Sequence, residues 1–136
     1  MPDQSSAALA NVRLQQAREC LQGAENELAV DLFKNSANRS YYCIFHAIRA
    51  VLALESFDSK KHSGVISAFR QRYIKTGIFP TKFSDIIEDA FEVRNDSDYL
   101  DFYVISKDAV VAQIENAKVF LAAAEEYVKA KNQPSV

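Results

Sequence analysis

Residues 36–55 read Ser36-Ala-Asn-Arg-Ser-Tyr-Tyr-Cys-Ile-Phe-His-Ala-Ile-Arg-Ala-Val-Leu-Ala-Leu-Glu55, and this stretch decides the fold. It contains neither Gly nor Pro, so nothing in it interrupts a helix. Its apolar residues recur at steps of three and four, the spacing of one helix face: Ala37, Tyr41, Ile44, Ile48 and Val51. The pattern predicts a helix over about 34–56 whose apolar face lies in the core.

A polar stripe follows the same spacing on the neighbouring face and consists of Arg39, Tyr42, His46 and Arg49. Polar groups beside a buried face need partners. Two interpretations stay open. The stripe either fixes how the helices pack, with Arg39 paired to an acid of 85–101, or it forms a His/Arg site that binds phosphate or transfers protons.

Length and composition limit the class of protein. A chain of 136 residues with 49% hydrophobic content suits one domain with its own core, and three Gly and three Pro are few for the turns of an all-β fold. Cys20 and Cys43 both fall in helical apolar patterns rather than in a disulfide framework. With no apolar run long enough for a membrane span and no signal peptide, we expect a cytoplasmic protein without membrane contact.

The rest of the chain completes a bundle. Alternating Ala and Leu predict long helices over about 6–30 and 106–130, with Ser106 as the N-cap of the second. Two shorter helices, about 63–76 and 81–96, form a broken third segment between them. The predicted fold is therefore all-α, an up-and-down four-helix bundle.

Details of the boundaries follow from single residues. Ser63 is the expected N-cap of the first short helix, and Gly23 is expected to fray or kink the first long one. The domain is expected to span 5–130, and residues 131–136 should form a disordered tail.

Charge is unevenly distributed although the net charge is only −2. Residues 85–108 contain eight acids and two bases, whereas residues 59–84 contain no acid and six bases, which are Lys60, Lys61, Arg70, Arg72, Lys75 and Lys82. The two segments either attract each other as solvated helix faces or provide a surface for phosphate.

Arg94-Asn-Asp-Ser-Asp-Tyr99 is a second polar cluster, in a stretch expected to be an ordered loop from Arg94 to Tyr103. The Arg94 guanidinium suits phosphate, unless Asp96, Asp98 or Asp101 ties it down. No cofactor is expected, and no metal, because the two histidines do not have ligand spacing.

Several segments in the same order resemble the HEPN domain, in its small stand-alone branch. They are Asn38-Arg-Ser-Tyr-Tyr-Cys-Ile-Phe-His-Ala47, Lys61-His-Ser-Gly-Val-Ile-Ser67, Lys75-Thr-Gly-Ile-Phe-Pro80, and Arg94 with Asp98-Tyr99. The resemblance covers about residues 8–130. It implies a four-helix bundle that dimerises and is encoded beside a minimal nucleotidyltransferase as toxin and antitoxin.

The resemblance also implies a site. Active members have an Arg-x4–6-His motif that cuts RNA without metal; here its Arg falls on Arg94 and its polar residue on Asn95, but Tyr99 stands where His is expected. A phenol takes up a 2′-hydroxyl proton poorly at neutral pH, so catalysis is uncertain on this residue pattern. His46 is the alternative catalytic group. Tyr99 and Tyr103 are candidates for adenylylation by the partner.

Two functions therefore stay open. The chain is either the toxin-like, homodimeric half of such a pair, binding RNA or nucleotide as a metal-independent endoribonuclease, or a non-catalytic module that docks the nucleotidyltransferase and helps it bind its substrate. The residues expected to bind RNA or nucleotide are Arg39, Tyr42, His46, Lys60 and Lys61.

Overall fold

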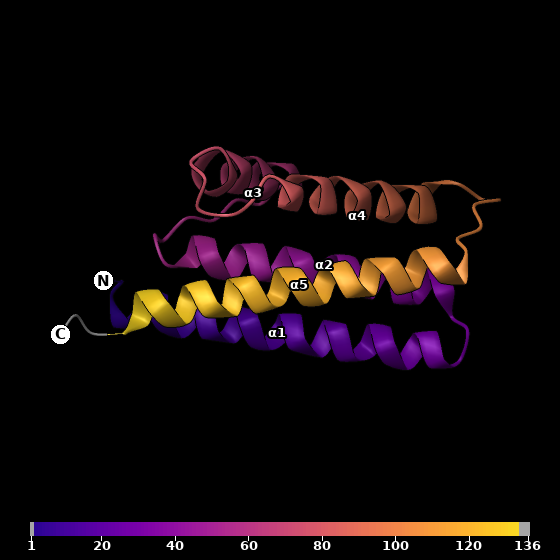
Figure 1. The fold of residues 1–136 in the computed structure, drawn as a ribbon, viewed down its shortest axis with the longest axis horizontal. Helices are drawn as coiled ribbons and strands as arrows, with labels where there is room; N and C mark the ends of the chain where they lie inside the picture. Colours follow the sequence, from indigo (N-terminus) through magenta and orange to yellow (C-terminus); the bar gives the residue numbers. More distant parts are fainter. Residues whose placement is uncertain (1, 134–136) are drawn as a thin grey trace.

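The computed structural model describes residues 2–133, and over that range the chain is all-helical (Figure 1). The α-helices are α1 (Gln4–Ala29), α2 (Phe33–Ala53), α3 (His62–Phe69), α4 (Lys82–Tyr99) and α5 (Lys107–Asn132), and a π-helical turn, η1 (Arg70–Ile74), continues α3. The elements α3, η1 and α4 together take the place of the third helix, which confirms the helical bundle with a broken third segment.

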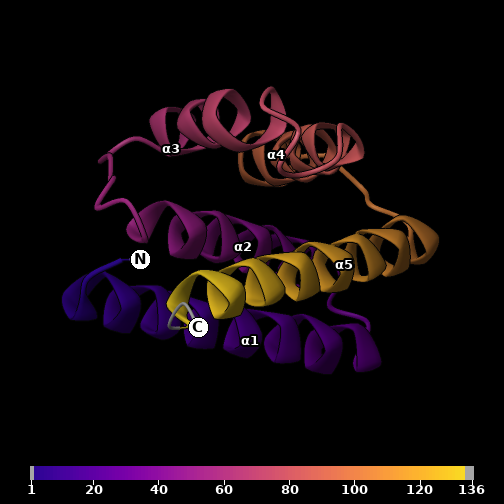
Figure 2. The same cartoon turned by 60° about the vertical axis from the view of Figure 1, so that its left-hand side comes forward.

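The helix α2 is the centre of the bundle. It packs against α1 and α5 on one side and against α3 and α4 on the other, so that the chain forms layers around it (Figures 1 and 2). Its apolar face is buried as predicted, and Tyr41, Ile44 and Ile48 are each at most 2% exposed. Residues flanking this face therefore lie at the seams between α2 and its neighbours.

Aromatic rings join the α3–α4 layer to α5. Phe69 is fully buried, with its ring centroid 5.4 Å from that of Tyr73, 5.2 Å from Phe79 and 5.6 Å from Phe120. Phe83 of α4 lies 4.9 Å from Phe120. Such tilted and offset contacts add to the burial of the rings.

The long helix α1 begins after Asp3, whose carboxylate accepts the N–H of Ser6 at 2.8 Å. It continues past Gly23 to Ala29, so the fraying expected from that glycine is absent. The side-chain carbons of Arg39 lie 3.8 Å from where a Cβ of residue 23 would stand, so the tertiary packing supports the helix at this point.

The start of α3 differs from the prediction. Its cap is Lys61, not Ser63, and the N–H of Lys61 donates to Ser59 Oγ at 3.3 Å. A Cβ at Gly64 would lie 2.6 Å from that same oxygen, so a side chain at position 64 would displace Ser59. Gly77, at φ +82°, follows η1 in the left-handed region that favours glycine, close to the predicted end of this helix.

The loop predicted from Arg94 to Tyr103 is wrong over its first half, because α4 continues to Tyr99. Asp98 lies one turn beyond Arg94, with 3.5 Å between carboxylate oxygen and Nε, and this i,i+4 pair supports the helix. Val93 packs on a small apolar cluster around Ile105. These contacts outweigh the tendency of Asn, Asp and Ser side chains to bond their own backbone.

At the C-terminus, Ser106 caps α5 as predicted and accepts the N–H of Ala109 at 3.1 Å. The helix includes Lys131 and Asn132, two residues assigned to the disordered tail by the sequence. Gln133 is the C-cap of the helix, and residues 134–136 of the predicted tail lie outside the described residues.

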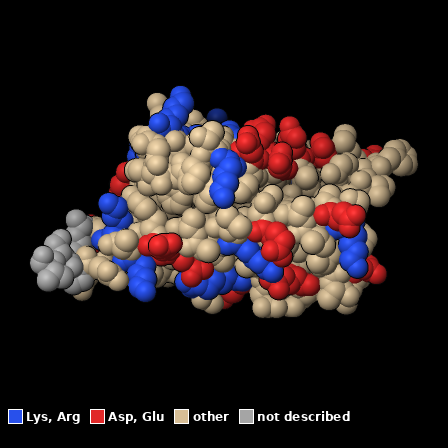
Figure 3. Space-filling view, viewed as in Figure 1, with Lys and Arg blue, Asp and Glu red and all other residues tan. Residues whose placement is uncertain are grey.

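Charges of opposite sign meet across the α3–α4 layer. Figure 3 shows acidic side chains gathered over α4 and basic ones beside α3. Arg70 pairs with Glu88 at 3.0 Å, as expected if the two segments attract each other, and Arg72 pairs with Glu55 at 2.6 Å. Within residues 2–133, no helix is apolar over the length that crossing a membrane requires.

Candidate functional site

The side chain of Arg94, a residue of α4, packs against α2 and does not point into solvent. Its guanidinium is 5.3 Å from the ring centroid of Tyr41 and 5.8 Å from that of Tyr42, and Nη2 donates to the Tyr42 hydroxyl at 3.4 Å. The nearby Asp98 carboxylate is the brace considered from the sequence. Cation–π contact and this pair hold the guanidinium in one place, and the side chain is still 22% exposed.

His62, at the first position of α3, reaches the same group of rings. Its Nδ1 lies 3.0 Å from the Tyr41 hydroxyl, and its ring stacks on Phe45 with centroids 4.0 Å apart. Burial lowers the pKa of His62, and the charges of Arg94 and Arg49 lower it further. The imidazole is therefore held in the neutral form in the folded protein.

His46 lies next along α2, with its ring centroid 6.1 Å from those of Tyr42 and Phe45. Its Nδ1 is buried without a hydrogen-bond partner among the described residues. Burial lowers the pKa of His46, as do the charges of Arg49, Arg13 and His62. Buried polar atoms in proteins normally have a hydrogen-bond partner, so the unpaired Nδ1 of His46 is an exception.

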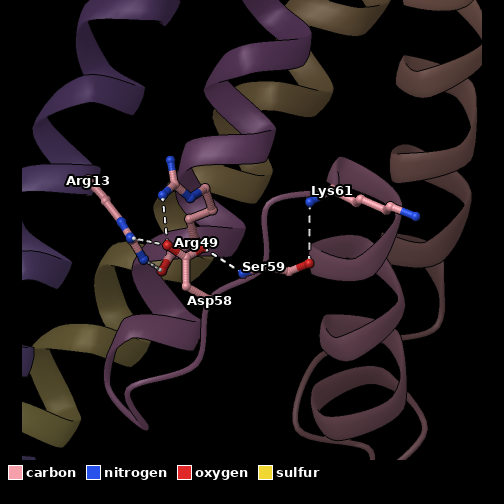
Figure 4. Close-up of polar contacts among 5 residues, drawn as sticks. All are labelled: Arg13, Arg49, Asp58, Ser59 and Lys61. Carbon is pink, nitrogen blue, oxygen red and sulfur yellow. Dashed lines mark hydrogen bonds and ion pairs between the residues drawn. The ribbon is translucent and has the colours of Figure 1, made fainter.

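Asp58 ties α1 to α2 at the far end of the stripe (Figure 4). Its Oδ2 lies 3.1 Å from Arg13 and 3.2 Å from Arg49, and its Oδ1 accepts the N–H of Ser59 at 2.8 Å. Burial acts to raise the pKa of Asp58, but the Ser59 N–H and the two guanidinium groups hold it below its usual value. The carboxylate thus stays ionised and fixes the linker that leads to α3.

We call the row formed by these residues the polar seam; its members are Tyr41, Tyr42, Phe45, His46, Arg49, His62 and Arg94. It combines two guanidinium groups, two imidazoles and two phenols along the α2 surface that faces α3 and α4. Guanidinium and neutral imidazole groups recognise phosphate oxygens through N–H donors. Imidazoles near neutrality also serve in proton transfer.

Some predicted site residues lie outside this seam. Arg39 is exposed over Gly23 of α1, and none of the ion pairs among the described residues joins it to an acid of 85–101. The Tyr99 side chain is 76% exposed at the end of α4, away from the rings that hold Arg94. Asn95 is half-buried beside Arg94, and Lys60 and Lys61 are exposed.

Tyr103, the second candidate for adenylylation, is half-buried at the end of the bundle beside the Ile105 cluster. Burial raises the pKa of its phenol, and Asp96 adds to the effect. Sequence reasoning missed His62, because the Lys60-Lys61-His62-Ser63 segment has the composition of a basic turn before a helix. The signal available was the turn itself, which places residue 62 where a helix begins.

The two histidines predict how stability depends on pH. Both have a folded pKa below the ordinary value of 6.5, so protons bind the unfolded chain more readily than the folded one. The free energy of unfolding should fall as the pH drops below about 6.5, which urea unfolding between pH 7.5 and 5.5 measures. In the double variant His46→Gln/His62→Gln this part of the slope should disappear. An unchanged slope would rule out the two imidazoles as its source.

Comparison with known proteins places this chain in a family. The family model described as HEPN domain matches residues 10–129. A UPF0332 protein of Thermotoga maritima is 32% identical over 113 residues, 83% of this chain and 86% of that protein. A Methanocaldococcus jannaschii protein, named as a toxin candidate, is 27% identical over 88% of this chain and 81% of its own. The crystal structure of TT1696 from Thermus thermophilus has the same fold, with a TM-score of 0.72 over 86% of this chain and 96% of that one at 15% identity. The chain belongs to the HEPN domain family.

Proposed function

We propose that this protein is the toxin-like component of a HEPN–nucleotidyltransferase pair and that its polar seam binds RNA or nucleotide. The observation that carries the proposal is the guanidinium of Arg94, which is held against Tyr41 and Tyr42 in the row that contains both histidines. Family membership and the name of the Methanocaldococcus jannaschii relative support the toxin-like role.

The residues of the seam suit a phosphodiester. Arg94 offers a fixed cation with several N–H donors, and the Tyr42 hydroxyl beside it offers a further polar contact. In a metal-independent endoribonuclease reaction, the 2′-oxygen of RNA attacks phosphorus and the bond to the 5′-oxygen breaks. One proton leaves the 2′-hydroxyl and one reaches the 5′-oxygen, so a group that takes up protons near neutrality is required. His46, whose ring centroid lies 6.1 Å from that of Tyr42 in the seam, is our candidate for this role. Tyr99, exposed at the end of α4, stays the candidate that the family motif implies.

Arg94→Ala tests the proposal directly. We expect RNA affinity to fall by about tenfold or more, because a charge-assisted contact to phosphate is lost, and any cleavage to fall with it. The matched control is Arg18→Ala, which removes an exposed arginine that pairs with Glu125 of α5. Binding and cleavage are measured on structured RNA, with circular dichroism as the check on folding. Equal binding and cleavage by wild type and Arg94→Ala would exclude Arg94 from the site.

A specific observation also favours the second function, a non-catalytic module that docks the nucleotidyltransferase. Apolar side chains stand exposed at one end of the bundle: Phe102 is 97% exposed, Val104 86% and Leu100 52%. Exposed apolar side chains that gather in one place mark interaction surfaces. In this function the seam would hold part of the partner's substrate without cutting it.

Phe102→Glu is the test of docking. We expect it to weaken the complex with the nucleotidyltransferase encoded beside this gene by about tenfold or more, since burying an unpaired charge at an interface is costly. Val12→Glu is the control, because Val12 is 55% exposed in the N-terminal half of α1. The N-terminus lies at the other end of the bundle from the connection between α4 and α5 (Figure 1). Complex formation is measured by light scattering coupled to gel filtration. Intact binding by Phe102→Glu would remove this surface from the interface.

Three further parts of the proposal concern the oligomeric state, covalent modification and location in the cell. We propose a homodimer, for which light scattering should give twice the 15.3 kDa chain mass. Tyr99 and Tyr103 remain candidates for adenylylation, and the exposed Tyr99 is the more accessible of the two. A cytoplasmic location is compatible with the free thiols of Cys20 and Cys43.

A further inference from the structure

An open pocket of about 530 Å³ lies where the end of α2, the linker after it and the start of α3 meet. We call it the Phe45 pocket. It is lined by Phe45, Arg49, Asp58, Ser59, Lys60 and His62. Three of these residues, Phe45, Arg49 and His62, belong to the polar seam, so the pocket adjoins the seam at its Arg49 end.

The hydrogen bond to Tyr41 determines what His62 presents. Burial raises the pKa of Tyr41 to about 12, against the opposing charge of Arg94, so its phenol keeps its proton. Tyr41 is 2% exposed, and its hydroxyl lies 3.0 Å from His62 Nδ1. We assign the phenol O–H as the donor and Nδ1 as the acceptor, because a buried phenol that keeps its proton needs an acceptor and Nδ1 lies beside it. In the neutral imidazole the proton then sits on Nε2. His62 therefore contributes an N–H donor to the pocket and not a base.

Three other side chains of the lining are donors or cations. Arg49 and Lys60 are positively charged, and the Ser59 hydroxyl has a proton to donate. Asp58 is the single acid in the lining, and its two oxygens already accept from Arg13, Arg49 and the Ser59 N–H. Arg13 and Arg49 pair with this carboxylate, and Lys60 in the lining adds a third cation near it. The local charge favours an anion.

Two of the proposed donors, His62 and Arg49, are held in place by packing and by an ion pair. The rings of His62 and Phe45 stack at 4.0 Å with 23° between their planes, and Arg49 lies 6.0 Å over the Phe45 ring. Asp58 holds Arg49 from the other side. Donors held in place by packing lose little freedom on binding.

We propose that the Phe45 pocket binds a phosphate group, with Arg49, Lys60 and the Nε2–H of His62 as its donors. The phosphate is either a phosphodiester of RNA one or more nucleotides away from Arg94, or a phosphate of a free nucleotide. An RNA phosphodiester as the ligand rests on the proposed function, whereas phosphate binding by the pocket does not.

The experiment titrates the full chain with two probes, a single-stranded RNA hexanucleotide and inorganic phosphate, and follows the amide and His62 ring signals by NMR. Lys60→Ala should weaken hexanucleotide binding by about 3- to 10-fold. It should also reduce the number of counterions released on binding by about one, which is measured from the slope of the affinity against salt concentration. Lys34→Ala is the control, since this exposed lysine lies at the other end of α2. His62→Leu removes the ring donor, and its amide signals report whether the fold persists.

Each outcome decides something. If Arg94→Ala lowers the affinity for the hexanucleotide but Lys60→Ala and His62→Leu bind it as tightly as wild type does, the pocket proposal is wrong and the proposed function stands. If the hexanucleotide does not bind but inorganic phosphate shifts the His62 signals in wild type and not in Lys60→Ala, the pocket stands with a free phosphate ligand and RNA binding fails. If neither probe moves the His62 signals, the pocket proposal is overturned.

Discussion

Replacing Phe69 by alanine should lower the free energy of unfolding by about 3–5 kcal/mol, the cost of a large cavity in a packed core. Phe69 is fully buried and meets Tyr73, Phe79 and Phe120, so its removal takes one packing partner from each of these three rings. This loss is a large part of the roughly 5–15 kcal/mol that typically stabilises a domain. Urea unfolding followed by circular dichroism measures it.

The control for this variant is Phe102→Ala, which removes a ring of the same size that is 97% exposed. We expect its stability to stay within about 0.5 kcal/mol of wild type. A loss below about 1 kcal/mol for Phe69→Ala would mean that the aromatic cluster does not join the α3–α4 layer to α5 in the way described.

Asp58→Ala should be the second costly substitution, at about 2–3 kcal/mol of unfolding free energy. Its partner Arg13 is only 6% exposed, and without the carboxylate its guanidinium keeps a single backbone contact, to the carbonyl of Arg49 at 3.1 Å. The expected cost is below that of a fully buried pair because the Asp58 side chain is 50% exposed.

A double variant identifies the cause of this loss. Arg13→Met/Asp58→Ala removes the buried cation as well, and it should be more stable than Asp58→Ala alone by about 1–2 kcal/mol. Asp85→Ala, which removes an exposed acid of α4, is the control and should change little. If the double variant unfolds no later than the single one in urea, the unpaired guanidinium does not explain the effect.

The helices were predictable from the sequence because the apolar period is local. Ala and Leu at steps of three and four predicted α1 and α5, and Ala37 to Val51 predicted the buried face of α2. The extension of α4 was not predictable in this way. Besides the local Arg94–Asp98 pair, it has the support of tertiary contacts: Val93 packs on the Ile105 cluster, and Arg94 packs against Tyr41 and Tyr42, more than fifty residues earlier in the chain.

The candidate site was predictable only in part for the same reason. Arg94, Tyr42 and His46 were named from the sequence, and the structure places all three in the polar seam. Arg39 shares their stripe by spacing, but α1 rather than α4 lies opposite it. His62 joins the seam through Tyr41 and Phe45; the turn before α3 is visible in the sequence, but these contacts depend on how the linker folds back onto α2.

The layered arrangement has a consequence for dynamics. Arg94 and His62 reach α2 from the α3–α4 layer, whereas Arg49 and Tyr42 belong to α2 itself. The complete set of donors therefore exists only while the two layers are closed on each other. A ligand that touches both would act as a latch, and backbone amides across α3 and α4 would exchange with deuterium more slowly when it is bound. Backbone amides where α1 packs against α5 lie outside the interface between α2 and the α3–α4 layer and would exchange at an unchanged rate.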